Sequence, residues 1–113
     1  MEQAIGLFIR YLAVERGLSE NYQLSTQRSL TDFARWCKAK HKIDNRRAVT
    51  LSMLSEYLAE RKRGGLSAAS IKLNIVAFKI FFRFLAAGRL VERDPAEALA
   101  LPRIERYLPE TLN

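Results

Sequence analysis

Apolar residues recur every three or four positions along most of the chain, which is the spacing of amphipathic helices. The first stripe consists of Ile5, Phe8, Ile9 and Leu12. It predicts a helix over residues 2–16 that Gly17 ends. The second stripe consists of Leu30, Phe33 and Cys37. It predicts a helix that Ser19 caps and that ends within residues 41–45, because serine is a favoured N-cap residue.

The pattern continues in two further helices after a basic and polar connection. The third stripe consists of Leu51, Leu54, Tyr57 and Leu58. Thr50 is the expected cap of this helix, and residues 63–65, an arginine and two glycines, stop it. The longest stripe consists of Ile71, Ile75, Phe78, Phe82 and Leu85. It predicts a central helix between a Ser67 cap and Gly88.

A short fifth helix is predicted where Asp94 precedes Pro95, because Asp is a good cap and Pro suits the first helical turn. Period-two alternation and Asn-Gly turns are absent from the sequence, so no strand is expected. Short loops imply antiparallel neighbours. We therefore predict one all-α domain over residues 1–100, a bundle of four main helices plus a short fifth helix. The tail over residues 101–113 contains two prolines and is expected to be a linker.

The charge of the chain points to a class of partner. Its 113 residues carry a formal net charge of +7, and a field of this size on a small surface favours polyanions. The excess is uneven, because residues 35–47 hold six Lys and Arg against one acid, while residues 92–113 hold five acids against three bases. Nucleic acid is therefore the leading partner class. An ordinary solvated basic face is the alternative.

Few residues offer chemistry for catalysis. His41 is the one histidine and Cys37 the one cysteine in the sequence, so metal sites and nucleophile-base pairs lack parts. We expect no enzyme activity in this segment, no cofactor, and a Cys37 that is buried packing instead of a reactive thiol. His41, within a run of lysines, is expected to be an exposed or phosphate-side residue and not a catalyst. No apolar run reaches the roughly 20 residues that span a bilayer, so we expect a cytoplasmic protein with neither membrane nor small-molecule partners.

An ordered series of motifs covers essentially the whole chain. It consists of Phe8-x-x-Tyr11-Leu12-x-x-Glu15-x-Gly17-Leu18-Ser19-x-Asn21, Phe33-x-x-Trp36, Gly65-Leu66-Ser67-x-x-Ser70-Ile71, Phe81-Phe82-x-Phe84-Leu85, Asp94-Pro95, Leu101-Pro102 and Leu108-Pro109. The series resembles the N-terminal core-binding domain of tyrosine recombinases, most closely the Xer-type recombinases and phage-type integrases. Taken together, the motifs are far more specific than any one of them.

The resemblance implies a SAM-like orthogonal helical bundle that forms half of a clamp around double-stranded DNA. It also implies a parent enzyme that breaks and rejoins DNA strands, with a separate C-terminal catalytic domain that would begin near Leu108. The implied partners are duplex DNA and other recombinase protomers on paired half-sites. None of the family's catalytic residues maps onto this chain, and Tyr107 belongs to the linker pattern.

The resemblance places the second and fourth helices at the DNA. Hydroxyl and amide side chains suit phosphate oxygens and base edges, and arginine can pair with guanine. On the second helix the candidate DNA-binding residues are Asn21, Gln23, Ser25, Thr26, Gln27, Arg28 and Arg35. On the fourth helix they are Ser67, Ser70, Lys72, Lys79 and Arg83, and the last three share one flank at about 100° per residue. The competing interpretation is that Ser19 and Asn21 cap the helix and the others are solvated.

The chain departs from the family pattern on both helices. One arginine that is common on the second helix of relatives is absent, and Leu73 and Asn74 stand where relatives often carry paired arginines. Val76 and Ile80 replace small polar residues, which makes this face more apolar. Packing against another helix, contact with thymine methyl groups, and weaker DNA binding are all open interpretations. A helical protein-interaction module and a freestanding DNA-binding regulator are the alternative functions.

Overall fold

The computed structural model of the chain describes residues 1–17 and 19–99, and in them it contains helices and no strand. The helices are α1 (Glu2–Val14), α2 (Glu20–His41), the 3-10 turn η1 (Arg46–Ala48), α3 (Leu51–Arg63) and α4 (Ala68–Ala87). The prediction of an all-α fold with four main helices is thereby confirmed. The predicted linker over residues 101–113 lies outside the described residues.

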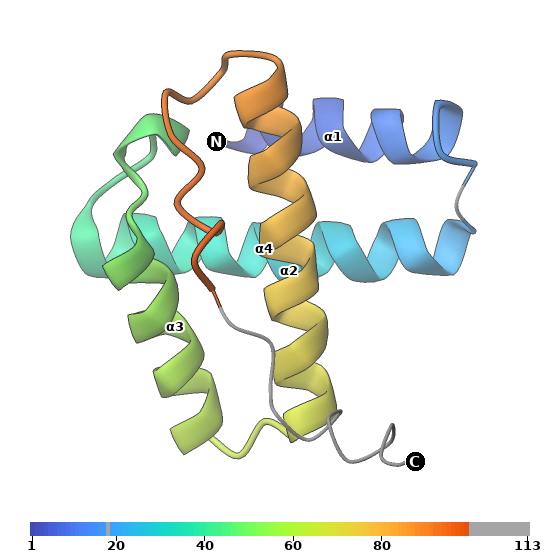
Figure 1. The fold of residues 1–113 in the computed structure, drawn as a ribbon. Coiled ribbons are helices and arrows are strands. Elements are labelled where there is room, and N and C mark those ends of the chain that lie inside the picture. Colours follow the sequence, from blue (N-terminus) through green and yellow to red (C-terminus); the bar gives the residue numbers. More distant parts are fainter. Residues whose placement is uncertain (18, 100–113) are drawn as a thin grey trace, which may run out of the picture.

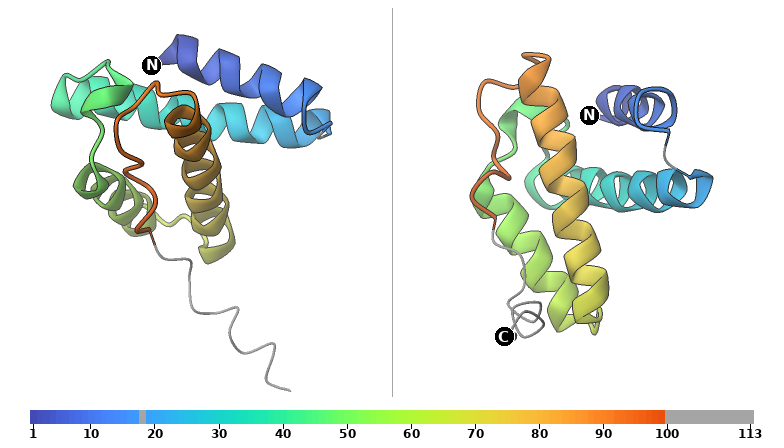
Figure 2. Two further views of the ribbon diagram at one scale, coloured as in Figure 1. Left: turned by 45° about the horizontal axis from the view of Figure 1, so that its top comes forward. Right: turned by 45° about the vertical axis from the view of Figure 1, so that its right-hand side comes forward.

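The helices form two antiparallel pairs that cross at a steep angle (Figures 1 and 2). One pair is α1 and α2, and the other is α3 and α4. α4 lies across the first pair, and both α4 and α2 pack against each of the other three helices. The bundle is therefore orthogonal, as predicted.

Hydroxyl side chains cap the N-termini of three helices at the predicted positions. Ser19 Oγ accepts a hydrogen bond from the Tyr22 amide at 3.2 Å, and Thr50 Oγ1 accepts one from the Met53 amide at 3.2 Å. Ser67 Oγ does the same at the start of α4. Each cap satisfies an amide that has no partner inside its helix, which is why these residues set the helix boundaries.

The end of α2 uses a residue that the sequence pattern did not single out. Lys42 adopts a left-handed backbone with φ of 57°, and the Ile43 amide then donates to the Cys37 carbonyl at 3.2 Å. This is the arrangement that glycine usually provides at a helix C-terminus. The chain can turn here without a glycine because the returning hydrogen bond holds the left-handed residue in place.

Aromatic rings from three helices meet in the centre of the bundle. Phe78 of α4 lies with its ring centroid 4.9 Å from that of Phe33 in α2 and 5.9 Å from that of Tyr57 in α3. Phe8 joins α1 to α4 through Phe81, at 5.3 Å. All five side chains are buried. Burial of large rings is the main contribution that fixes how the two helix pairs cross.

The buried face of α4 is broader than the predicted stripe. Ile75, Phe78, Phe82 and Leu85 are buried as expected, but Ile71 is only half-buried. Phe81 and Asn74, which lie outside the stripe, are buried. The reason is that α4 packs on α1 and α2 as well as on α3, so more than one side of it is covered.

Cys37 is buried and forms no disulfide, which confirms its predicted role as core packing. Burial raises the pKa of its thiol to about 12, because the charged thiolate is poorly solvated there. The thiol is therefore protonated at neutral pH and is a poor nucleophile.

The chain after α4 turns back and runs between α3 and α4 (Figures 1 and 2). We call residues 89–99 the closing segment. The predicted short fifth helix is wrong for the described residues, where residues 95–98 form a turn. The backbone hydrogen bonds of this turn span three residues. The Glu97 amide donates to the Asp94 carbonyl at 3.3 Å, and the Leu99 amide donates to the Ala96 carbonyl at 3.1 Å.

Lys79 ties this turn to α4. Its ammonium on α4 donates to the carbonyl of Ala96 at 3.3 Å and to the carbonyl of Glu97 at 3.2 Å. The closing segment is thus held to α4 by a side chain.

Candidate nucleic-acid interface

The outward face of α2 carries most of the predicted polar residues. Asn21, Ser25, Gln27, Arg28 and Arg35 are exposed there, and Gln23 is half-buried. Their exposure follows from the period of the helix, because Leu30, Phe33 and Cys37 turn the opposite side toward the core. The helix therefore presents a row of hydroxyl, amide and guanidinium groups to solvent.

Thr26 does not belong to this row. Its side chain is 5 % exposed, because it lies one turn before Leu30 on the buried side of α2. The structure therefore removes Thr26 from the surface on which the sequence analysis placed it.

A polar hollow of about 210 Å³ lies where α2, α3 and the start of α4 meet. Its lining consists of Ser25, Arg28, Ser29, Asp32, Tyr57, Arg61, Leu66, Ser70, Leu73 and Asn74. It brings together three of the predicted DNA-binding residues, Ser25, Arg28 and Ser70. We call it the polar hollow below.

The two serines at the start of α4, Ser67 and Ser70, have different surroundings. Ser67 is the N-cap, and its hydroxyl also lies 3.1 Å from the hydroxyl of Ser70. Ser70 lines the polar hollow and is half-buried. Ser67 therefore acts as a cap, whereas Ser70 lines the hollow.

Arg61 lines the polar hollow from α3 and was not among the DNA-binding residues predicted from the sequence. Its guanidinium carbon lies 4.9 Å from the centroid of the Tyr57 ring, a distance suited to a cation-π contact. Burial raises the pKa of Tyr57, and the nearby Arg61 charge opposes this effect. The sequence contained a signal for this contact, because Arg61 follows Tyr57 by four residues, and residues four apart lie beside each other on a helix.

The predicted ridge of Lys72, Lys79 and Arg83 is not continuous with this hollow. Lys79 is held by the closing segment, as described above. Arg83 is exposed and lines a second hollow together with Asp94 and Glu97. Lys72 is half-buried. The closing segment covers this flank of α4 and places acidic residues beside the basic ones, which the sequence pattern of α4 alone could not indicate.

Replacing Lys79 with methionine is expected to loosen the closing segment. The variant loses two hydrogen bonds from a charged donor, and each such bond contributes about 1 kcal/mol or more. Amide hydrogen exchange at Glu97 and Leu99 should become roughly fivefold faster or more, as measured by NMR. Lys62→Met, an exposed substitution on α3, is the matched control. Unchanged exchange at both amides would show that Lys79 does not hold the segment.

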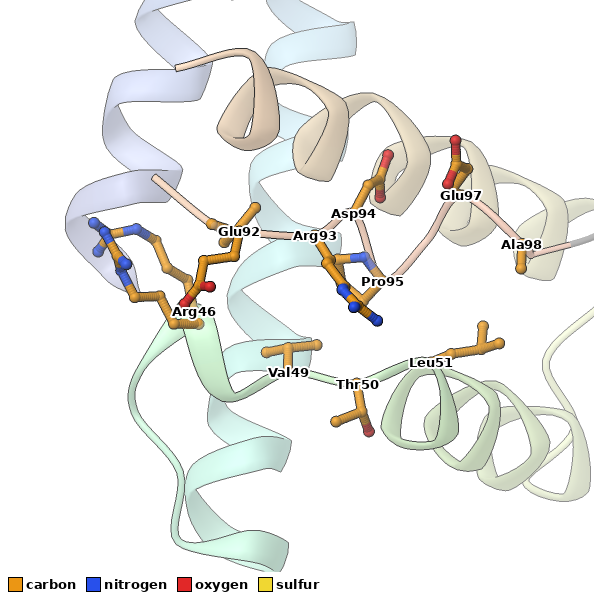
Figure 3. A pocket seen from close by; sticks show the side chains of 12 residues that line it. Arg46, Val49, Thr50, Leu51, Glu92, Arg93, Asp94, Pro95, Glu97 and Ala98 are labelled. Carbon is orange, nitrogen blue, oxygen red and sulfur yellow. The ribbon is translucent and has the colours of Figure 1, made fainter. Parts of the chain in front are cut away.

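Another hollow, of about 540 Å³, lies between the closing segment and the residues from η1 to the start of α3. Figure 3 shows Arg46 and Glu92 beside each other at one end of it, with Arg93, Asp94 and Glu97 further along. Arg46 Nε donates to the Leu90 carbonyl at 3.1 Å. Because charges of both signs line it, this hollow lacks the excess positive field that would attract a polyanion.

A charged cluster joins the end of α2 to α3. Glu60 accepts hydrogen bonds from Lys40 at 3.1 Å and from Trp36 Nε1 at 3.2 Å, and His41 Nε2 lies 3.0 Å from a Glu56 oxygen. The hydrogen bond from Lys40 lowers the pKa of Glu60. The predicted exposure of His41 is confirmed, and its pairing with Glu56 indicates a structural role.

Neither a metal cluster nor a membrane span is found within the described parts of the chain. No group of three or more His, Cys, Asp or Glu side chains there could hold a metal ion. None of the helices in those parts is long and apolar enough to cross a membrane.

The fold and the outward face of α2 define a small helical domain with a polar and basic surface. A family model described as "Phage integrase, N-terminal SAM-like domain" matches residues 5–88. Because the match covers most of the chain, the chain belongs to this family.

Curated relatives agree with the family. The chain is 30 % identical over 113 residues to "Tyrosine recombinase XerD" of Oceanobacillus iheyensis, covering all of this chain and 38 % of the relative. It is 33 % identical over 115 residues to "Tyrosine recombinase XerC" of Serratia marcescens, again over the whole chain and 37 % of the relative. The chain thus spans little more than a third of the length of these relatives. No solved structure matches it significantly.

Proposed function

We propose that the chain is the DNA-binding domain of a site-specific tyrosine recombinase or integrase. It holds duplex DNA through the outward face of α2 and the start of α4, mainly by phosphate contacts, which supply most of the affinity of such proteins. The observation that carries the proposal is the polar hollow, where Ser25 and Arg28 of α2 meet Ser70 of α4. Lys79 is left out of the proposed surface because it holds the closing segment.

The names of the relatives support a parent protein that recombines DNA at specific sites. In this proposal the parent enzyme breaks and rejoins DNA strands, and its catalytic residues lie outside the described part of this chain. Its partners are duplex DNA and further protomers on paired half-sites. The domain binds the duplex and positions the protein on it, and the exposed amides and guanidinium groups of α2 are suited to these contacts.

One observation favours a second candidate, a helical protein-interaction module. Leu73 on α4 is 57 % exposed and Leu24 on α2 is 53 % exposed, so apolar groups are mixed with the polar ones on these helices. Val76 and Ile80, also on the more apolar face of α4, are half-buried. Single exposed leucines are common on protein surfaces, which is why we rank this function second.

Fluorescence anisotropy with a labelled duplex tests the proposal, with gel filtration of the chain alone beside it. DNA binding predicts an affinity that falls linearly with salt on logarithmic axes. Self-association without duplex binding would favour the interaction module.

A further inference from the structure

Asn74 is a buried amide without a partner in its surroundings. Its side chain is 8 % exposed, and among residues 1–17 and 19–99 it makes no hydrogen bond. A buried polar group of this kind costs free energy, so most such groups in folded proteins are paired. Asn74 lines the polar hollow, where a bound group could pair with it.

The groups around Asn74 favour a ligand with several acceptor oxygens. Arg28 and Arg61 line the hollow from two different helices, and both are exposed enough to move toward a ligand. Ser70 and Tyr57 add hydroxyl groups to the same wall. An arginine fork, hydroxyl groups and an amide NH₂ are the donors that bind phosphate oxygens.

Asp32 is the one acid in the lining of the hollow. Against the two arginines it leaves a positive balance, but its carboxylate repels an anion and weakens its binding. If the ligand were instead a group with hydrogen-bond donors, such as a base edge, Asp32 would attract it. The sign of its effect therefore separates the two ligand chemistries.

We propose that the polar hollow is a phosphate-binding pocket, in which one phosphate of the DNA backbone is held between Arg28 of α2 and Arg61 of α3. Asn74 and Ser70 donate hydrogen bonds to the same phosphate. This inference rests on the proposed function and adds to it a third helix, α3, and a discrete site. It also accounts for the burial of an unpaired amide.

The first test uses inorganic phosphate and the full chain, followed by NMR at the Asn74 side-chain amide and the Arg61 Nε-H signal. We expect saturable shifts of both signals. Arg61→Gln should weaken phosphate binding about tenfold, since a charge-assisted hydrogen bond contributes on the order of 1.5 kcal/mol. Asp32→Asn should tighten it severalfold. Arg63→Gln, an exposed change on α3 outside the hollow, is the control and should leave binding unchanged.

The second test uses duplex DNA and distinguishes a backbone phosphate from free phosphate. Arg61→Gln should reduce the slope of log K against log salt by about one unit, while Arg63→Gln reduces it less. If the chain binds duplex but Arg61→Gln leaves the slope unchanged, the pocket is refuted and the proposed function stands. If the chain binds inorganic phosphate but no duplex, the proposed function fails and the pocket takes free phosphate. Weaker phosphate binding in Asp32→Asn would overturn the anion assignment.

Discussion

Replacing Phe78 by alanine is expected to lower the free energy of unfolding by about 3–5 kcal/mol. Its side chain is fully buried, and its ring contacts those of Phe33 and Tyr57 from two other helices. Truncation removes the buried ring and leaves a cavity between helices that cross, so the surrounding side chains can close it only in part. The loss is a large fraction of the stability of a domain of this size.

Urea denaturation followed by circular dichroism measures this loss, because the helical signal reports the whole bundle. Leu73→Ala is the matched control on the same helix, since Leu73 is 57 % exposed and its truncation should change stability by less than about 0.5 kcal/mol. A loss below about 1 kcal/mol in Phe78→Ala would mean that the ring cluster does not hold the helix pairs together.

The double variant Arg28→Gln and Arg35→Gln is expected to bind duplex DNA roughly 30-fold more weakly at low salt. This estimate takes about 1 kcal/mol for each exposed phosphate contact, discounted for solvent screening. The slope of log K against log salt should fall by about two units, because each lost contact releases about one fewer counterion. Both arginines are exposed on α2, so their replacement should leave the fold intact.

Arg10→Gln with Arg89→Gln is the control for net charge. These arginines are exposed on α1 and after α4, and neither lines the polar hollow. The control removes the same charge but should change the slope by much less than two units. Equal slopes for the two double variants would show that the chain attracts DNA by its overall charge and not through α2.

The fold could be predicted from the sequence because its signals are local. The spacing of apolar residues located four helices, and the hydroxyl groups of Ser19, Thr50 and Ser67 located three of their starts. The fifth helix was predicted from Asp94 and Pro95 alone, whereas Lys79 holds the closing segment through contacts between residues 17 and 18 positions apart. Such a contact has no local sequence signal.

The exposure of single residues in the candidate site could be predicted from the sequence, but not how these residues lie relative to one another. The family resemblance placed Arg28 and Ser25 on an outward surface of the second helix, and both are exposed there. It could not show that Arg61 of α3 meets them, because that depends on how the two helix pairs cross. Thr26 shows the limit of composition, since a hydroxyl residue among polar neighbours still lies on the buried side of α2.

The capture of the closing segment by Lys79 has a mechanical consequence for anything joined to the chain beyond Leu99. Residues 89–99 do not act as an extended linker, because Lys79 in the middle of α4 holds the carbonyls of Ala96 and Glu97. At about 3.5 Å per extended residue, these eleven residues would otherwise have added nearly 40 Å of reach. A shorter tether keeps an attached domain close to the helical body and so raises its effective local concentration at a shared ligand.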